Sequence, residues 1–407
     1  MKVDLFMMPA VPASFDERRT DRPVGRSVER YQRMIDELRQ IAVLADEAGI
    51  DAISTTEHHF HTEGGEANPN PVMLLVDLAS RTKNIRLIPM SIVLNATNPI
   101  RAAEDIALLD HYSGGRADVC FARGYQKRWV QIMSQGGPTA NQDNRDEESR
   151  EKMREYVEIV QKCWSEDAFD FNGKYFQVPY PYDEGIKGWG PAEWTRKFGA
   201  DGEIDEEGTI RKIGVIPKPL HDIEVHIPFT GSPETLAWSA EKGFTTWMMA
   251  SRPEAFRQAC ETVQKAAADA GRSQALGQRC GAVRGVSIGD TEEEAFELAA
   301  LTTGYEFNQY WSYFGFLETV RGPEDDPNKP VSFESNEACT KRLIDAGWQL
   351  CGTVDQVKRQ LSDLHSVYGD GALEWFQWNF FYQGIVPMDT QRRQLELFTE
   401  KILPEFR

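Results

Sequence analysis

Short apolar runs alternate with amphipathic stretches along most of the chain. The run VDLFMM at 3–8 suits a buried parallel strand, and residues 27–49 follow with apolar positions at helical spacing. Gly49 stands where a helix C-cap glycine belongs. This order recurs and predicts eight strands, at 3–8, 51–60, 85–94, 117–124, 225–231, 245–250, 282–288 and 373–380. Strands that alternate with helices form a parallel sheet.

Helices are predicted between and after these strands, and two segments break the rhythm. The helices fall at 27–49, 70–82, 99–113, 148–166, 232–243, 253–270, 353–367 and 389–402. Residues 167–222 carry Gly, Pro and aromatic residues without a helical period, and residues 289–350 form a second excursion. Eight βα units favour a closed (β/α)8 TIM barrel with these segments inserted after units four and seven.

One barrel domain is therefore expected over residues 1–407. An open doubly wound sheet is the alternative, but its G-x-G-x-x-G fingerprint is absent after the first strand. The net charge of −19 repels nucleic acid phosphates and anionic lipid, so neither is expected as a partner. No apolar run approaches the roughly 20 residues that cross a bilayer. The six cysteines form no C-x-x-C pair, and a cytoplasmic protein with free thiols is expected.

Chemistry in a barrel lies where strands end, which selects Glu57-His58-His59-Phe60-His61 after the second strand. A histidine can take or give a proton near neutral pH. Adjacent strand residues face opposite sides, so one of His58 and His59 is expected to face the pocket. A pair of structural histidines is an equal alternative. A metal site would need His61 or Glu63 as well, and the missing H-E-x-x-H spacing leads us to expect no metal.

Two helix starts could bind a phosphate through their free amides. Ser232 and Pro233 suit the N-cap and first position of one helix, and Thr353 begins a capping box at another. The pattern alone does not choose between them. Arg123, at the end of the fourth strand, could hold a phosphate or carboxylate, or form a surface ion pair. The aromatic segment 304–316 could cover a substrate pocket as a lid or pack on the barrel flank.

Three stretches carry a family resemblance: EHHF followed by T-E-G and N-P, SIVLNATNPIRAAEDIALLDHYSGGRADVCFARGY, and GSPETLAWSAEKG. They are similar to the bacterial luciferase family, to its α subunit in particular, most densely over 50–126 and 225–250. The resemblance implies a two-component monooxygenase that takes reduced FMN from a separate flavin reductase. It would insert one oxygen atom from O2 into a small organic substrate through a flavin 4a-hydroperoxide.

The resemblance also implies roles for individual residues. His58 takes the place of the catalytic histidine, Arg123 contacts FMN, and Ser232 and Thr235 match the phosphate-binding positions. Met90 and Ser91 match a non-proline cis peptide under the flavin ring. The family's reactive pocket cysteine does not carry over, since Ala122 stands in its place. The substrate pocket is expected to include His59, Tyr125, Tyr310, Trp311 and Phe314.

Luciferase-like barrels pair through helices of the first units, and Val72, Leu75, Leu78 and Ala79 exceed a minimal core stripe there. A homodimer is therefore expected. The main alternative function is a flavin- or deazaflavin-linked hydride-transfer oxidoreductase on the same barrel. A flavin-binding protein without catalysis and a metal-dependent barrel hydrolase are the other hypotheses.

Overall fold

The computed structural model describes residues 1–141, 144–228, 232–380 and 384–407. Residue contacts divide the chain into two compact units. The first consists of Met1–Met90 with Glu224–Arg407, and the second of Ser91–Ile223. The expectation that the whole chain acts as one domain stays a prediction.

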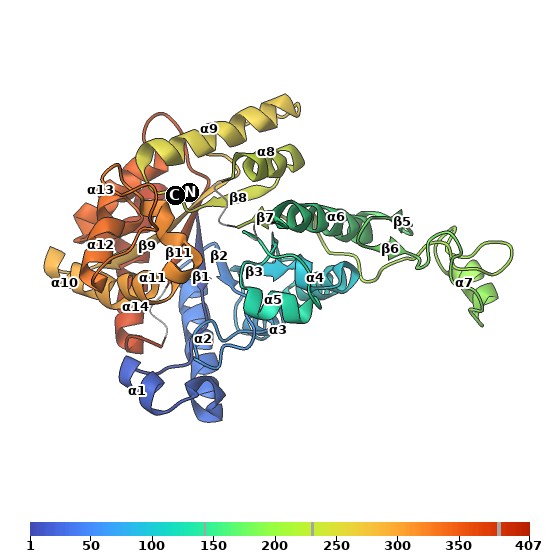
Figure 1. Cartoon of the computed structure of the whole chain (residues 1–407), viewed down its shortest axis with the longest axis horizontal. Coiled ribbons are helices and arrows are strands. Elements are labelled where there is room, and N and C mark those ends of the chain that lie inside the picture. Colours follow the sequence, from blue (N-terminus) through green and yellow to red (C-terminus); the bar gives the residue numbers. More distant parts are fainter. Residues whose placement is uncertain (142–143, 229–231, 381–383) are drawn as a thin grey trace. The chain divides into compact units, whose positions relative to one another are not determined.

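The predicted parallel (β/α)8 barrel is confirmed. In the first unit, the central strand β1 pairs with β2 and β11, β2 pairs with β3, and β7, β8, β9 and β11 pair in succession (Figure 1). All these pairs are parallel. The strands are β1 (Lys2–Met7), β2 (Ala52–Thr55), β3 (Arg86–Val93), β4 (Val119–Ala122), β7 (Val225–Ile227), β8 (Thr245–Met248), β9 (Cys280–Ile288) and β11 (Trp375–Asn379). Each lies within or overlaps a predicted strand, although several are shorter.

Helices follow the strands as the apolar periodicity predicts. Ser27 caps α2, because its hydroxyl accepts a hydrogen bond from the amide of Arg30, and Gly49 leaves the helix with φ 76°. The other helices of the first unit that match predictions are α3 (Pro71–Ala79), α8 (Pro233–Lys242), α9 (Pro253–Asp269), α13 (Val354–His365) and α14 (Met388–Glu396); α2 itself spans Val28–Glu47. None of the described helices is long and apolar enough to cross a membrane.

The second unit contains helices α4 (Pro99–Ser113), α5 (Lys127–Met133) and α6 (Asp146–Ser165), and then a long excursion. The excursion contains an antiparallel hairpin of two short strands, β5 (Phe171–Asn172) and β6 (Gln177–Val178), each two residues long. The helix α7 (Ala192–Phe198) follows it. Figure 1 shows α7 at the end of the excursion farthest from α4 and α5. The sequence of 167–222 shows no helical period, but the structure has a helix there. Since α7 buries no residue, it has no apolar stripe by which a sequence pattern could reveal it.

The second excursion is also largely helical. It contains the short helices α10 (Glu292–Ala299), α11 (Tyr305–Gln309) and α12 (Asn336–Asp345). It also contains an unpredicted strand, β10 (Gln349–Gly352), which pairs with β9. Trp311 is 2% exposed, and its ring lies 4.9 Å from Phe307 and 5.0 Å from Phe316. Phe307 in turn contacts Trp348 at 4.5 Å. Segment 304–316 was expected either to cover the pocket as a lid or to pack on the barrel flank. Phe307 and Trp311 are buried, as packing on the flank requires. The helix α1 (Phe15–Thr20) precedes α2.

A carboxylic acid is buried on the first strand. Asp4 is fully buried, and its Oδ2 accepts hydrogen bonds of 2.7 Å from Ser54 and from Gln377. Among the described residues its other oxygen, Oδ1, has no hydrogen-bond partner. Burial raises the pKa of Asp4 to about 7, although the two hydrogen bonds act in the opposite direction.

Candidate active site

The histidine-rich segment after β2 is a loop. The predicted strand through residue 60 is wrong, because β2 ends at Thr55 and Phe60 adopts a left-handed backbone with φ 67°. The alternation of faces along a strand therefore does not decide which of His58 and His59 points into the site. Tertiary contacts decide it instead.

Backbone hydrogen bonds hold this loop in place. The amide of His58 donates to the carbonyl of Asn68 at 2.9 Å, and the Asn68 side chain donates to the carbonyl of Thr56 at 2.9 Å. Gly25 packs so closely that a Cβ there would lie 2.8 Å from the carbonyl oxygens of His61 and Thr62. The side chains on the loop are thus carried by a fixed backbone.

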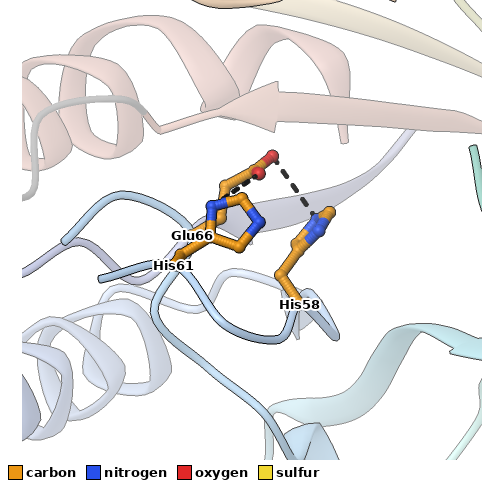
Figure 2. Close-up of side chains that lie close together, drawn as sticks. All are labelled: His58, His61 and Glu66. Atoms are coloured by element: carbon orange, nitrogen blue, oxygen red, sulfur yellow. Dashed lines mark ion pairs between the residues drawn. The ribbon is translucent and has the colours of Figure 1, made fainter. Parts of the chain in front are cut away.

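His58, His61 and Glu66 converge in one cluster, and Figure 2 shows both imidazoles facing the carboxylate. His58 Nε2 lies 3.4 Å from Glu66 Oε1, and His61 Nδ1 lies 3.6 Å from Glu66 Oε2. The three side chains are 8%, 5% and 3% exposed. The hydroxyl of Tyr310 donates a 2.8 Å hydrogen bond to Glu66 Oε2 and lies 3.4 Å from His61 Nδ1. A buried carboxylate with two imidazoles can hold a proton or a cation.

A second carboxyl group, Glu306 on α11, lies near this cluster. Its pKa is raised to about 7, mainly by burial and also by the charge of Glu66, while Arg18 acts in the opposite direction. Arg18 is held by the carbonyl oxygens of Glu63 and Val11, each 2.9 Å away. The Glu63 side chain itself is exposed, so the carboxylate that joins the histidines is Glu66 and not Glu63.

His59 points elsewhere, although it is adjacent to His58. Its Nε2 lies 3.2 Å from Glu57 Oε1, and its ring lies 5.8 Å from that of Phe60. Among the expected pocket residues, Tyr310 reaches the cluster and Phe314 packs on Tyr310 at 5.3 Å. Trp311 is buried in the aromatic core described above. The part that these side chains take in a substrate pocket stays a prediction.

Two residues expected at the site, Arg123 and Tyr125, follow β4 in the second unit. Arg123 Nη1 pairs with Asp146 Oδ1 at 2.7 Å, and the Arg123 side chain is 18% exposed. An ion pair was one of the alternatives expected for the Arg123 side chain. Gly124 follows with φ 78°, and a Cβ there would meet Val93 and Val130 at 2.6 and 2.7 Å. Tyr125 accepts a hydrogen bond from the side-chain amide of Gln126.

The other expected cofactor positions lie on β3 and α8. Ser232 has the extended backbone of an N-cap residue, Pro233 begins the helix, and Thr235 is 9% exposed. Met90 is buried, and Ser91 is the next residue on β3. The cis peptide bonds recorded among the described residues all precede proline, which counts against the cis geometry expected between Met90 and Ser91. Contact of any of these residues with FMN stays a prediction.

Residues 20–371 match the sequence model of the luciferase-like monooxygenases. The chain belongs to this family. Among its relatives, 3,6-diketocamphane 1,6-monooxygenase of Pseudomonas putida is 25% identical over 374 residues, which are 89% of this chain and 91% of that protein. The oxygenase component of the flavin-dependent trigonelline monooxygenase of Acinetobacter baylyi is 30% identical over 148 residues, 36% of this chain and 38% of that one.

Solved structures of luciferase-like proteins share the fold. The oxygenating constituent of the P. putida 3,6-diketocamphane monooxygenase, a type II Baeyer–Villiger enzyme in complex with FMN, has a TM-score of 0.74 at 22% identity and covers 100% of this chain and 99% of that one. The coenzyme F420-dependent tetrahydromethanopterin reductase of Methanopyrus kandleri has a TM-score of 0.64 at 15% identity, covering 100% and 99%. At these identities the structures establish the barrel fold alone. The family itself is one of flavin-dependent monooxygenases.

A polar ligand would suit two further residues of this luciferase-like chain. Asn379, at the end of β11, is 2% exposed, and among the described residues neither its amide oxygen nor its amide nitrogen has a partner. Thr56, directly after β2, is 4% exposed, and its hydroxyl likewise has none. An unsatisfied buried polar group costs roughly 1–3 kcal/mol, which a flavin or substrate could recover by hydrogen bonding.

Sequence reasoning missed Asn379, Thr56 and Glu66. The rule that selected Arg123, a polar residue at the carboxyl end of a strand, would have found Asn379 in LEWFQWNF and Thr56 in DAISTTEHHF. The spacing of residues in the sequence does not mark Glu66, because only the turn of the loop brings Glu66 next to the histidines.

Proposed function

We propose that this luciferase-like protein is the oxygenase component of a two-component system, inserting one oxygen atom from O2 into a small organic substrate. The observation that carries the proposal is the buried His58 in the loop directly after β2, with Glu66 and Tyr310 behind it. FMN, supplied in reduced form, would contribute the electrons that activate oxygen. The protein has groups that suit FMN. The guanidinium of Arg123 and the start of α8 could bind its phosphate, and the polar groups of Thr56 and Asn379 at strand ends could bind other parts of it.

His58 is proposed to handle the proton of the reaction at Nε2. The Glu66 carboxylate, 3.4 Å away, stabilises a proton on that nitrogen, and Tyr310 fixes the carboxylate by donating to its other oxygen. Because His58 is 8% exposed, its proton exchanges with a bound ligand in an environment from which bulk water is largely excluded. Water would divert the activated oxygen to hydrogen peroxide.

Two features, each considered within its own unit, are proposed as phosphate-binding groups for FMN: Arg123 and the start of α8. Arg123 offers a charged donor, and a helix N-terminus offers free amides. The ion pair between Arg123 and Asp146 must then be shared with the phosphate or exchanged for it. This predicts that Asp146 tunes flavin affinity.

The proposed partners are a separate flavin reductase and a second copy of this chain. The trigonelline relative is named as an oxygenase component, which supports a separate reductase. Leu75, Leu78 and Ala79, three of the four residues that suggested a homodimer, are buried within the protomer, and Val72 is half-buried. Met73, at 71% exposure, is the most exposed apolar residue of α3. We place the reaction in the cytoplasm, since no disulfide joins cysteines among the described residues.

The test is a turnover assay without an assumed substrate. The purified protein is loaded anaerobically with reduced FMN, mixed with oxygen, and offered a panel of ketones, aldehydes and phenols. We expect a product one oxygen atom heavier from one of these classes, with less hydrogen peroxide than free reduced FMN gives. Stoichiometric peroxide with every substrate would contradict the proposal. Anaerobic oxidation of an alcohol with transfer of hydride to FMN or F420 would instead support the hydride-transfer alternative.

A further inference from the structure

We propose that His58, His61 and Glu66 form a binding site for one divalent d-block cation of the zinc type. The ligand atoms of the three residues lie within 4.8 Å of one another, and all three side chains are buried (Figure 2). Two imidazoles and a carboxylate are ligands that Zn²⁺ accepts readily, and three protein ligands leave a fourth position open.

The spacing agrees with tetrahedral coordination. Ligands at about 2.1 Å from a tetrahedral zinc ion lie about 3.4 Å from one another. His58 Nε2 and Glu66 Oε1 are 3.4 Å apart, and His61 Nδ1 lies 3.6 Å from Glu66 Oε2. The two distances run to different oxygens of Glu66, so the carboxylate must turn for one ion to bind all three residues, whose ligand atoms lie within 4.8 Å of one another.

Supporting groups orient the ligands as they do at metal sites. Tyr310 donates a 2.8 Å hydrogen bond to Glu66 Oε2, which leaves Oε1 directed at His58. Phe60 and Glu66 both adopt left-handed backbone conformations, with φ 67° and 45°, so the loop turns back between the ligands. The backbone of His58 is itself held by the carbonyl of Asn68.

The local charge favours a cation. The Glu66 carboxylate is the negative charge at the cluster, and it also acts on the neighbouring Glu306. A divalent ion would offset the buried carboxylate charge. The surrounding burial would strengthen that attraction, since charges interact more strongly away from water.

A bound ion would regulate the reaction rather than take part in it. This consequence rests on the proposed function, because a bound ion would occupy the Nε2 lone pair of His58 and prevent it from handling a proton. Zinc is thus expected to inhibit oxygenation reversibly, and a chelator to restore it.

Cobalt(II) tests the site directly, because its visible absorption reports coordination geometry. Chelator-treated, flavin-free protein is titrated with Co²⁺, and Zn²⁺ is then added. We expect a one-to-one complex with the intense visible bands of four-coordinate cobalt, abolished by Zn²⁺. His61→Asn and Glu66→Gln should each weaken Co²⁺ binding at least about tenfold.

His59→Asn is the matched control, since this adjacent histidine pairs with Glu57 outside the cluster. It should bind Co²⁺ like the parent protein. Far-UV circular dichroism and the thermal midpoint establish that each variant is folded. Cobalt spectra without four-coordinate bands, or equal affinity in all three variants, would overturn the site. Oxygenation is measured separately: cobalt binding without any oxygenated product would remove the proposed function and leave the site standing.

Discussion

Replacing Asp4 with asparagine should change how the stability of the protein depends on pH. Asp4 is fully buried, and its pKa lies near 7 in the folded protein against 3.8 as the reference value. Between these two values the folded protein keeps a proton that the unfolded chain releases. The free energy of unfolding therefore falls as pH rises through this window. A difference of about three units corresponds to about 4 kcal/mol in total.

Roughly 2.5 kcal/mol of that total falls between pH 5 and pH 8. Asp4→Asn removes the titration and keeps an oxygen that can accept from Ser54 and Gln377. Relative to the parent, the variant should gain roughly 2.5 kcal/mol in free energy of unfolding between pH 5 and pH 8. Urea titrations of both proteins at each pH measure this, and any constant effect of the substitution cancels in the comparison.

Asp201→Asn, at an exposed aspartate, is the control and should follow the parent at both pH values. Parallel curves for the parent and Asp4→Asn would refute the reasoning. They would mean that Asp4 is ionised in the folded protein at pH 5, so that its two hydrogen bonds outweigh burial.

Three further predictions concern the site and the aromatic segment. His58→Ala should leave FMN affinity within a few-fold and divert oxygen from product to peroxide; unchanged coupling would remove its proposed role. Arg123→Ala should weaken the binding of FMN far more than that of riboflavin, since a charge-assisted contact is worth roughly 1.5–3 kcal/mol. Equal losses of affinity for both ligands would place Arg123 away from the phosphate. Asp146→Asn should instead tighten FMN binding. Trp311→Ala should lower the free energy of unfolding by about 3–5 kcal/mol by urea titration, and a loss under 1 kcal/mol would mean that Trp311 is not a core residue.

The barrel was predictable from the sequence because burial leaves a period in the chain. Apolar runs such as VDLFMM and the helical stripe of 148–166 record which side chains face the core. Elements that bury little leave no such record. Helix α7 has no buried residue, so it was not predicted. Strand β10 is largely buried, but its sequence QLCG contains no apolar run that marks a strand.

The site was predictable only in part. Position at the end of a strand was enough to select His58. The partners of His58 depend on contacts that the spacing of residues does not encode. Tyr310 and Glu66 are 244 residues apart in the sequence. The left-handed turn at Phe60 brings Glu66 back toward the histidines, whereas the sequence had suggested Glu63 as the carboxylate. The ion pair of Arg123 with Asp146 likewise joins two elements, β4 and α6, whose packing the sequence pattern leaves open.

Oxygen-18 labelling tests the central claim most directly. The protein is supplied with reduced FMN and ¹⁸O2 in ordinary water, together with the substrate panel, and products are analysed by mass spectrometry. The account predicts a product that carries one ¹⁸O atom and is lost in the His58→Ala variant. A product whose new oxygen comes from water, or oxidation that proceeds without oxygen, would contradict the assignment of this chain as a monooxygenase.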